Sequence, residues 1–277
     1  MNNIGIIGFG NMGSCLGERL KSKEHPIWTF DKDKKKTEKL SGINLADSNI
    51  DLVREVETII LAVKPQDFGA TLDEIKNETE GKLVISIAAG ITTGYIEKIL
   101  GKVRVIRTMP NMPARIGRGI TCLCKGQFAT EKDSNFTRQL FENLGLILIL
   151  EEDMINEATA VSGSGPGYVF DLIETKKIDI NNKAALERFR EEFTMLLIGA
   201  AIGIGFMPKD ATKLAQATVD GSIALLKYSK LSAQELRKQI TSKGGTTEAA
   251  LEVLHRGGDL DEAVKAAVVQ ARQLAKK

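Results

Sequence analysis

The spacing of hydrophobic positions changes once along the chain, near residue 153. Before that point, short runs rich in β-branched residues alternate with stretches that have helical spacing. This alternation predicts βαβ units, and therefore an α/β fold with a doubly wound, mostly parallel sheet of the Rossmann type. The predicted strands lie at residues 4–8, 26–30, 58–63, 83–89, 103–110 and 145–152.

After Asp153 the strand pattern stops, and the rest of the chain has the spacing of consecutive helices. The segments SGSGPG and SKGGTT interrupt these helices, and the polar stretch from Thr175 to Lys183 predicts a loop between two of them. We therefore predict two domains, a Rossmann domain at residues 1–153 and an all-helical domain at residues 154–277.

The composition narrows the class of function. The chain has 277 residues, of which 43% are hydrophobic, and a formal charge of +2, which is too small for the electrostatic footprint of a nucleic-acid binder. The longest mostly apolar run, from Met195 to Met207, is shorter than the roughly 20 residues of a membrane helix. The start of the chain lacks the features of a signal peptide. We expect a cytoplasmic protein that acts on a small molecule, without nucleic-acid or membrane partners.

The candidates for metal or nucleophilic chemistry are few. Cys15, Cys122 and Cys124 have neither a zinc-site spacing nor the even number typical of a disulfide framework, so we expect no metal. The two histidines, His25 and His255, lie at a predicted loop and at a charged helix end, where a structural role is expected for each. The chemistry of the protein therefore has to need few acid or base groups.

A GxGxxG motif follows the first predicted strand and opens the first predicted helix. In this context Gly8 permits a tight turn, Gly10 lets the backbone approach a pyrophosphate, and Gly13 allows close packing, while the helix N-terminus attracts phosphates. Its position at the first turn of a βαβ chain makes a dinucleotide site the favoured interpretation. The motif residues are Gly8, Phe9, Gly10, Asn11, Met12 and Gly13.

The second predicted strand ends at Asp31, near the usual position of the residue that binds the adenosine ribose. A carboxylate there slightly favours NAD, because it repels a 2′-phosphate. Lys32, together with the lysines at 34–36, favours NADP if these side chains neutralise such a phosphate, although they also fit a solvated helix start. The choice between NAD and NADP stays open.

Two further strands end in segments that are expected to face a cofactor. Carboxyl ends of strands in such sheets border the cofactor crevice. Each segment also fits a simpler interpretation, a turn for the first and tight packing for the second. The first segment is Ala62, Val63, Lys64 and Pro65, and the second runs from Ser86 through Ala88, Ala89 and Gly90.

Taken in order, several segments resemble those of the pyrroline-5-carboxylate reductases, and they span nearly the whole chain. The RTMPN, SGSGP and GGTT segments are the most specific of them. The matching segments are GFGNMG at 8–13, AVKP at 62–65, SIAAG at 86–90, RTMPNMP at 107–113, SGSGPGYVF at 162–170 and TSKGGTTEAAL at 241–251.

The resemblance implies an enzyme that reduces 1-pyrroline-5-carboxylate to L-proline, the last step of proline biosynthesis, with NADPH or NADH as the hydride donor. It implies that the helical domain binds the substrate and forms a homodimer or a larger homo-oligomer. Asn49 and Ala62 to Pro65 match the family's cofactor-binding positions. Thr247 matches the residue that hydrogen-bonds the ring nitrogen, in the catalytic role, and the amides of Gly245 and Thr246 match the clamp on the substrate carboxylate. Ser242, in the same loop, is a further expected substrate-binding residue.

Physical reasoning on the residues supports a carboxylate site in this loop. Two glycines before a helix that starts near Thr246 expose backbone N–H groups, and the helix dipole adds positive potential. The alternative is that Thr246, Thr247 and Ser164 are ordinary helix caps. A protonated imine is already electrophilic, so the protein mainly has to position it. Thr247 is too weak an acid to be a proton source by itself.

The chain departs from the family pattern at three places. Lys243 replaces the proline of the usual Ser-Pro-Gly-Gly stretch, Gly167 follows SGSGP, and residues 175–193 are expected to be extra material. In that segment, Leu186, Phe189 and Phe193 fall on one face of a predicted amphipathic helix. These departures leave two alternatives, a related reductase of another imine or a hydroxy acid, and a dinucleotide-binding protein without catalysis. The retained GGTT run argues against the second.

Overall fold

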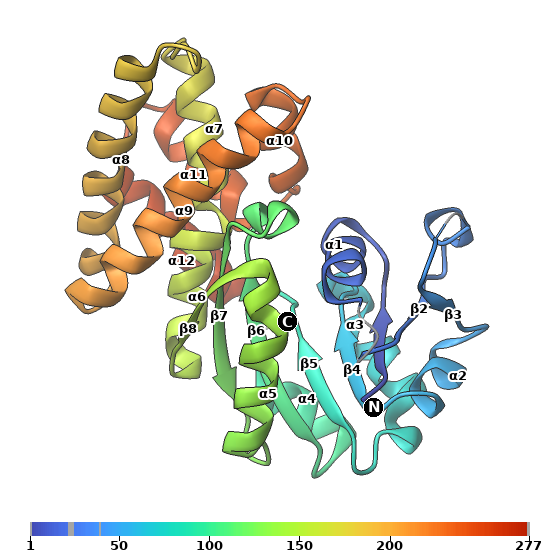
Figure 1. Ribbon diagram of the computed structural model, residues 1–277. Helices are drawn as coiled ribbons and strands as arrows, with labels where there is room; N and C mark the ends of the chain where they lie inside the picture. The colour runs from blue at the N-terminus through green and yellow to red at the C-terminus, as the bar shows by residue number, and fades with distance from the viewer. Residues whose placement is uncertain (1, 22–24, 39, 276–277) are drawn as a thin grey trace. The chain divides into compact units, whose positions relative to one another are not determined.

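The computed structural model describes residues 2–21, 25–38 and 40–275 (Figure 1). The elements of the first half are β1 (Ile4–Ile7), α1 (Asn11–Leu20), β2 (Ile27–Phe30), β3 (Asn44–Leu45), α2 (Asn49–Arg54), β4 (Thr58–Leu61), α3 (Pro65–Ile75), β5 (Leu83–Ser86), α4 (Thr93–Leu100), β6 (Arg104–Pro110), β7 (Gly119–Lys125), α5 (Glu131–Phe141) and β8 (Gly145–Ile149). The remaining helices are α6 (Ile155–Ala158), α7 (Gly165–Thr175), α8 (Lys183–Gly203), α9 (Pro208–Tyr228), α10 (Ala233–Ile240), α11 (Thr246–His255) and α12 (Leu260–Leu274).

The strands form one sheet in the order β3-β2-β1-β4-β5-β6-β7-β8. The strands from β3 to β6 all pair in parallel, which confirms the doubly wound, mostly parallel fold. In the register, Ile7 lies opposite Phe30 and Leu61, and Leu61 lies opposite Ser86. The segments that follow β1, β2, β4 and β5 therefore leave the sheet at the same carboxyl edge.

The core of this sheet lies around its central strands. Every residue of β1, β4 and β5 is buried, as expected for parallel strands that are covered on both faces. Phe68 and Leu72 of α3 pack into the same cluster as Leu61. This packing fixes the strand ends on which the dinucleotide motif lies.

The predicted strands match β1, β2, β4, β5, β6 and β8, but the sequence reading missed β3 and β7. β7 is buried from Gly119 to Cys124, and its two cysteines and one threonine replace the aliphatic residues that mark the other central strands. It also follows a single 3-10 turn (Met112–Ile116) instead of an α-helix, so the βαβ pattern did not indicate it. β3 has only two residues, both exposed.

The chain divides into two compact units. The first contains residues up to Thr108 together with Leu123–Asn143 and Ile149–Glu152, and the second contains Met109–Cys122, Leu144–Leu148 and the chain from Asp153 onward. The single boundary near residue 153 stays a prediction.

Helices make up the C-terminal part of the chain, where the described residues after Asp153 form no strand. The loop predicted between two helices is confirmed, since α7 ends at Thr175 and α8 begins at Lys183. Leu186, Phe189 and Phe193 are buried, and the two phenylalanine rings stack with their centroids 5.6 Å apart. The amphipathic face predicted for this segment is therefore confirmed. Within the described part of the chain, no helix is long and apolar enough to span a membrane.

Candidate functional site

Two glycines of the GxGxxG motif are required by the local backbone. Gly8 has a φ of +92°, and a Cβ there would lie 2.9 Å from the carbonyl of Ala62. A Cβ at Gly13 would lie 2.1 Å from the Gly8 carbonyl oxygen, which is shorter than any real contact. A Cβ at Gly10 would meet no described atom within 4 Å, so this glycine leaves open space above the loop.

Helix α1 presents an uncapped N-terminus at this open space. Gly10 is its N-cap, and no side chain of the described residues caps it. The first helical bond runs from the Ser14 amide to the Gly10 carbonyl at 2.9 Å, so the three preceding amides have no acceptor within the helix. The first turn carries no acidic residue, so the helix end keeps its positive potential.

A cavity of 740 Å³ lies at the carboxyl edge of the sheet, entirely within the first unit. Its size is in the range of cofactor sites. The lining residues are Ile7, Gly8, Gly10, Phe30, Asp31, Lys32, Lys36, Asn49, Ala62, Val63, Lys64, Gln66, Asp67, Ala70, Thr71 and Glu74.

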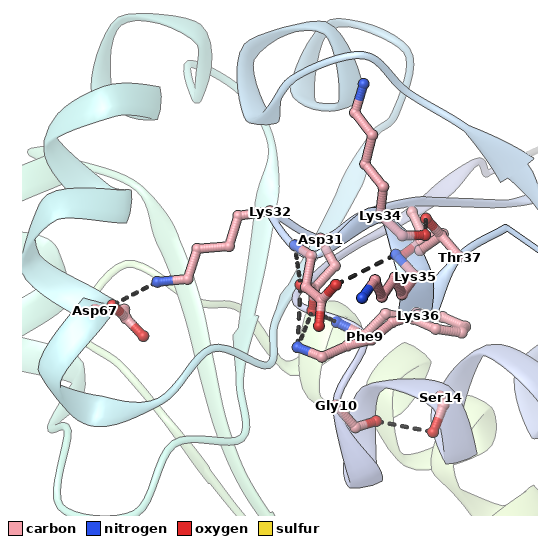
Figure 2. Close-up of polar contacts among 12 residues, drawn as sticks. Phe9, Gly10, Ser14, Asp31, Lys32, Lys34, Lys35, Lys36, Thr37 and Asp67 are labelled. Carbon is pink, nitrogen blue, oxygen red and sulfur yellow. Dashed lines mark hydrogen bonds and ion pairs between the residues drawn. The ribbon is translucent and has the colours of Figure 1, made fainter.

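Asp31 is buried beside the glycine loop, and Figure 2 shows the groups that surround it. The amide of Phe9 donates to Oδ2 at 2.7 Å, and the amide of Asp33 donates to Oδ1 at 2.8 Å. The ammonium of Lys36 lies 3.1 Å from both oxygens. Burial raises the pKa of this carboxyl, but the two amides and Lys36 outweigh it and hold the pKa below its usual range. Asp31 therefore stays ionised and supports the loop at Phe9.

The other lysines near Asp31 have different surroundings. Lys32 is exposed and forms an ion pair with Asp67 of α3 at 2.9 Å, and both residues line the cavity. Lys34 and Lys35 belong to an exposed 3-10 turn with Lys36, but of these three only Lys36 is among the described residues that line the cavity. The lysine run is therefore divided between the solvent and the cavity.

Asn49, the first residue of α2, brings an unpaired acceptor to the cavity wall. Its Nδ2 donates to Glu74 at 2.7 Å, while its buried Oδ1 has no hydrogen-bond partner among the described residues. A hydroxyl or amino group of a dinucleotide supplies the donor that this oxygen lacks. Together with the open space at Gly10, this oxygen shows that the residues present fit a dinucleotide.

Half of the cofactor-binding residues that were predicted from the sequence line this cavity. Gly8, Gly10, Asp31, Lys32, Asn49, Ala62, Val63 and Lys64 line it, whereas Phe9, Asn11, Met12, Gly13, Pro65, Ala88, Ala89 and Gly90 are not among its lining residues. The residues of α3 that form one wall of the cavity were not predicted from the sequence. They lie along one face of α3, which begins at the proline of AVKP, and a helix starting at that motif was the available signal. They are Gln66, Asp67, Ala70, Thr71 and Glu74.

The second group of predicted residues lies in the helical unit, where the starts of α7 and α11 meet. The hydroxyls of Ser164 and Thr246 are hydrogen-bonded to each other at 2.8 Å, and Ser164 is fully buried. Since this bond occupies the Thr246 hydroxyl, the group that Thr246 offers to a ligand is its backbone amide.

Thr247 is 4% exposed, and its hydroxyl makes no hydrogen bond with another described residue. Its γ-methyl group packs against Gly167, where an added Cβ would lie 2.5 Å from it. Gly167 therefore makes room for the Thr247 side chain at this position. The hydroxyl remains available to a ligand.

The loop between α10 and α11 is held by its own hydrogen bonds. Gly244 has a φ of +70°, its amide donates to the Glu248 carboxylate at 2.6 Å, and its carbonyl accepts from Gln270 at 2.6 Å. The amide of Gly245 donates to the Ser242 carbonyl at 2.9 Å, so it is already engaged. Lys243 is exposed.

A buried aspartate joins the helices on both sides of this loop. Asp171 of α7 is 1% exposed. It forms an ion pair with Arg237 of α10 and is hydrogen-bonded to His255 of α11, whose Nε2 lies 3.0 Å from Oδ1. The last turn of α10 and the last turn of α11 are thus both tied to the second half of α7. Among the described residues, no group of histidine, cysteine and acidic side chains could hold a metal ion.

Two family models match the chain, one over each region described above. Residues 3–90 match "NADP oxidoreductase coenzyme F420-dependent", and residues 191–277 match "Pyrroline-5-carboxylate reductase dimerisation". Across the full length, a pyrroline-5-carboxylate reductase from Mycobacterium leprae (strain TN) is 32% identical, over 99% of this chain and 97% of the relative. The chain belongs to the pyrroline-5-carboxylate reductase family.

Solved structures of the pyrroline-5-carboxylate reductase family extend this result to the fold. One from Coxiella burnetii is 30% identical, with a TM-score of 0.66 over 100% of this chain and 99% of that one. Plasmodium falciparum pyrroline carboxylate reductase, solved with NADP bound, is 27% identical, with a TM-score of 0.65 over 99% and 98%. The family resemblance found in the sequence is confirmed, and the family is one of NAD(P)H-dependent oxidoreductases.

Proposed function

We propose that this protein reduces 1-pyrroline-5-carboxylate to L-proline with a hydride from NADPH or NADH. Family membership gives the reaction class. The observation that carries the assignment is the start of α11. The Thr247 side chain there is 4% exposed, its hydroxyl makes no hydrogen bond with another described residue, and the first amides of the helix have no acceptor within it. This arrangement suits a small ligand that carries one carboxylate and one ring nitrogen.

In the first unit, the open end of α1 receives the pyrophosphate of the dinucleotide, at Gly10 and the amides that follow it. Asn49 offers its unpaired oxygen to a hydroxyl or amino group, and the turn from Ala62 to Lys64 borders the same cavity. The NADP in the Plasmodium relative supports this choice of cofactor class. We keep Ala88, Ala89 and Gly90 as cofactor residues, because β5 ends at the same edge of the sheet as β4.

In the second unit, the amide of Thr246 and the dipole of α11 attract the substrate carboxylate. Thr247 hydrogen-bonds the ring nitrogen and fixes the orientation of the imine. When bound, the reduced nicotinamide supplies the hydride that adds to the imine carbon. The electron pair of the C=N bond then moves onto the protonated nitrogen. The residues of the chain position the imine and exclude water, because a protonated imine needs no further activation.

The protein is further proposed to act as a homodimer, or a larger homo-oligomer, through its C-terminal helices. The match to the dimerisation family model covers residues 191–277, and within it α8 exposes Met195, Leu196 and Ile202, with Met195 and Ile202 two helical turns apart. Light scattering on Met195→Glu tests this interface. We expect a smaller assembly than for Ala184→Glu, an exposed position of the same helix that precedes the matched region.

A steady-state assay of the purified full chain tests the reaction. The protein is mixed with 1-pyrroline-5-carboxylate and either NADPH or NADH, and both nicotinamide oxidation and proline formation are measured. We expect both to proceed at equal rates. Turnover only with another imine or with a hydroxy acid would move the protein to a different substrate, and dinucleotide binding without any turnover would contradict the proposal. A cytoplasmic location and the status of residues 175–193 as extra material stay predictions.

A further inference from the structure

The carboxylate of Asp31 has no acceptor position left for a ribose. A carboxylate offers about four lone-pair sites. Oδ1 accepts from the Asp33 amide and from Lys36, and Oδ2 accepts from the Phe9 amide and from Lys36. Hydroxyl groups of an adenosine ribose therefore reach this carboxylate only if Lys36 leaves it.

Lys36 is the donor that can leave. The two amide donors belong to the backbone of the glycine loop and of the turn after β2, whereas Lys36 reaches Asp31 through a flexible side chain that is 41% exposed. Figure 2 shows its ammonium next to Asp31, and Lys36 lines the cavity that contains the glycine loop.

Whether Lys36 stays on Asp31 or leaves it, its positive charge favours a ribose that carries a 2′-phosphate. When it stays on Asp31, it cancels the negative charge that would repel a 2′-phosphate. When it leaves, it carries a positive charge at the same wall of the cavity. Lys32 is less suited to this role, because its ammonium is paired with Asp67 at 2.9 Å.

We propose that Lys36 is the residue that selects the 2′-phosphate of NADPH, and that Asp31 supports the glycine loop instead of selecting NADH. This proposal rests on the dinucleotide site of the proposed function, whatever the second substrate is. The position of Asp31 alone slightly favoured NAD, whereas the pairing of Asp31 with Lys36 favours NADP.

The test measures binding, so that it does not depend on turnover. Calorimetry on the full chain gives the dissociation constants of NADPH, NADH, adenosine 2′,5′-bisphosphate and adenosine 5′-monophosphate. For Lys36→Gln we expect roughly tenfold weaker binding of the two ligands that carry a 2′-phosphate, because a charge-assisted contact is lost, and little change for the other two. Lys36→Arg should keep the wild-type ratio.

Lys35→Gln is the matched control, because it removes the same charge from the same turn at a position outside the cavity wall. If Lys35→Gln weakened NADPH binding as much as Lys36→Gln does, the effect would come from the overall charge of the turn, and the proposal would be overturned. An unchanged NADPH to NADH ratio in Lys36→Gln would also overturn it. Failure of the wild type to bind any dinucleotide would instead contradict the proposed function.

Discussion

The helices at the two proposed ligand sites, α1 and α11, begin in the same way. Each has a glycine as its N-cap, Gly10 or Gly245, without a cap from any side chain that the structure describes. Each follows a glycine with positive φ, Gly8 or Gly244. Other helices have side-chain caps, each contributing about 1 kcal/mol, from Ser48, Thr92, Thr130, Asn182, Ser232 and Asp259.

The surroundings of these two helix starts differ. At α1 the first turn has no acidic residue, and the buried Asp31 holds the loop directly through the amide of Phe9. At α11 the first turn contains Glu248, whose carboxylate already accepts from the Gly244 amide, and the buried Asp171 holds the neighbouring helices through side chains. The first loop therefore suits the larger charge of a pyrophosphate, and the second suits a single carboxylate. A glycine-initiated helix makes an anion site possible, and its surroundings decide which anion fits.

The largest effect is expected for Gly13→Ala, which tests the rigidity of the first loop. Its Cβ would lie 2.1 Å from the Gly8 carbonyl oxygen, a backbone atom that cannot move aside cheaply. We expect a loss of about 3 kcal/mol in unfolding free energy, measured with urea, and loss of dinucleotide binding. Gly10→Ala, with open space at its Cβ, should weaken binding and leave stability nearly unchanged. Similar stability losses in the two variants would refute this view of the loop.

Asp171→Asn tests the support of the second loop. Removing the charge leaves Arg237 with Glu174 as its remaining ionic partner, at 3.3 Å, and weakens the contact with His255, so we expect about 2 kcal/mol less unfolding free energy. Glu187→Gln, which breaks an exposed ion pair with Arg190 in the same unit, should lower the unfolding free energy much less, because solvent screens an exposed pair. If the two variants were equally stable, Asp171 would not hold the helices around the loop.

A smaller effect is expected where Gly167 contacts Thr247. In Gly167→Ala the new methyl group has to displace the Thr247 γ-methyl, which lies 2.5 Å from it. We expect kcat/KM for pyrroline-5-carboxylate to fall about tenfold. Thr247→Ser removes that methyl and keeps the hydroxyl, so the double variant should recover most of the activity, whereas Thr247→Ala should not. A double variant as impaired as Gly167→Ala would show that the contact does not position the hydroxyl.

The smallest effect concerns the charge of Asp31. Its pKa in the folded protein lies below the ordinary value of 3.8, so its ionised form stabilises the fold at a pH above that value. The contribution is lost as the pH falls through the lowered pKa. The difference in unfolding free energy between wild type and Asp31→Asn should therefore be constant from neutral pH to about pH 5 and shrink in stronger acid. A difference that does not change in acid would mean that the charge of Asp31 does not support the loop.

The sequence predicts those parts of the sites whose residues are close together in the chain. The GxGxxG spacing, the start of α11 after Gly245 and the loop before α8 depend on local backbone preferences, and each can be recognised within a few residues. The buried strand β7 could not be recognised, because only a 3-10 turn and no α-helix separates it from β6, and its two cysteines interrupt the aliphatic run that marks the other central strands.

Contacts between distant residues could not be predicted in the same way. Gly167 and Thr247 are 80 positions apart, and Asp171 and His255 are 84 positions apart, so only the packing of the helices brings them together. The pairing of Lys36 with both oxygens of Asp31 is local, but the sequence does not show which lysine of the run turns toward the carboxylate. The family resemblance supplied Asn49, which no local pattern indicated.

The proposed function is the reduction of 1-pyrroline-5-carboxylate by a hydride from the bound dinucleotide. Its most direct test is a reaction with NADPH carrying deuterium at both C4 positions, with the proline analysed by mass spectrometry. We expect each proline to gain one deuterium, at the carbon that was the imine carbon. Proline without deuterium, or a protein that binds both ligands and forms no proline, would contradict it.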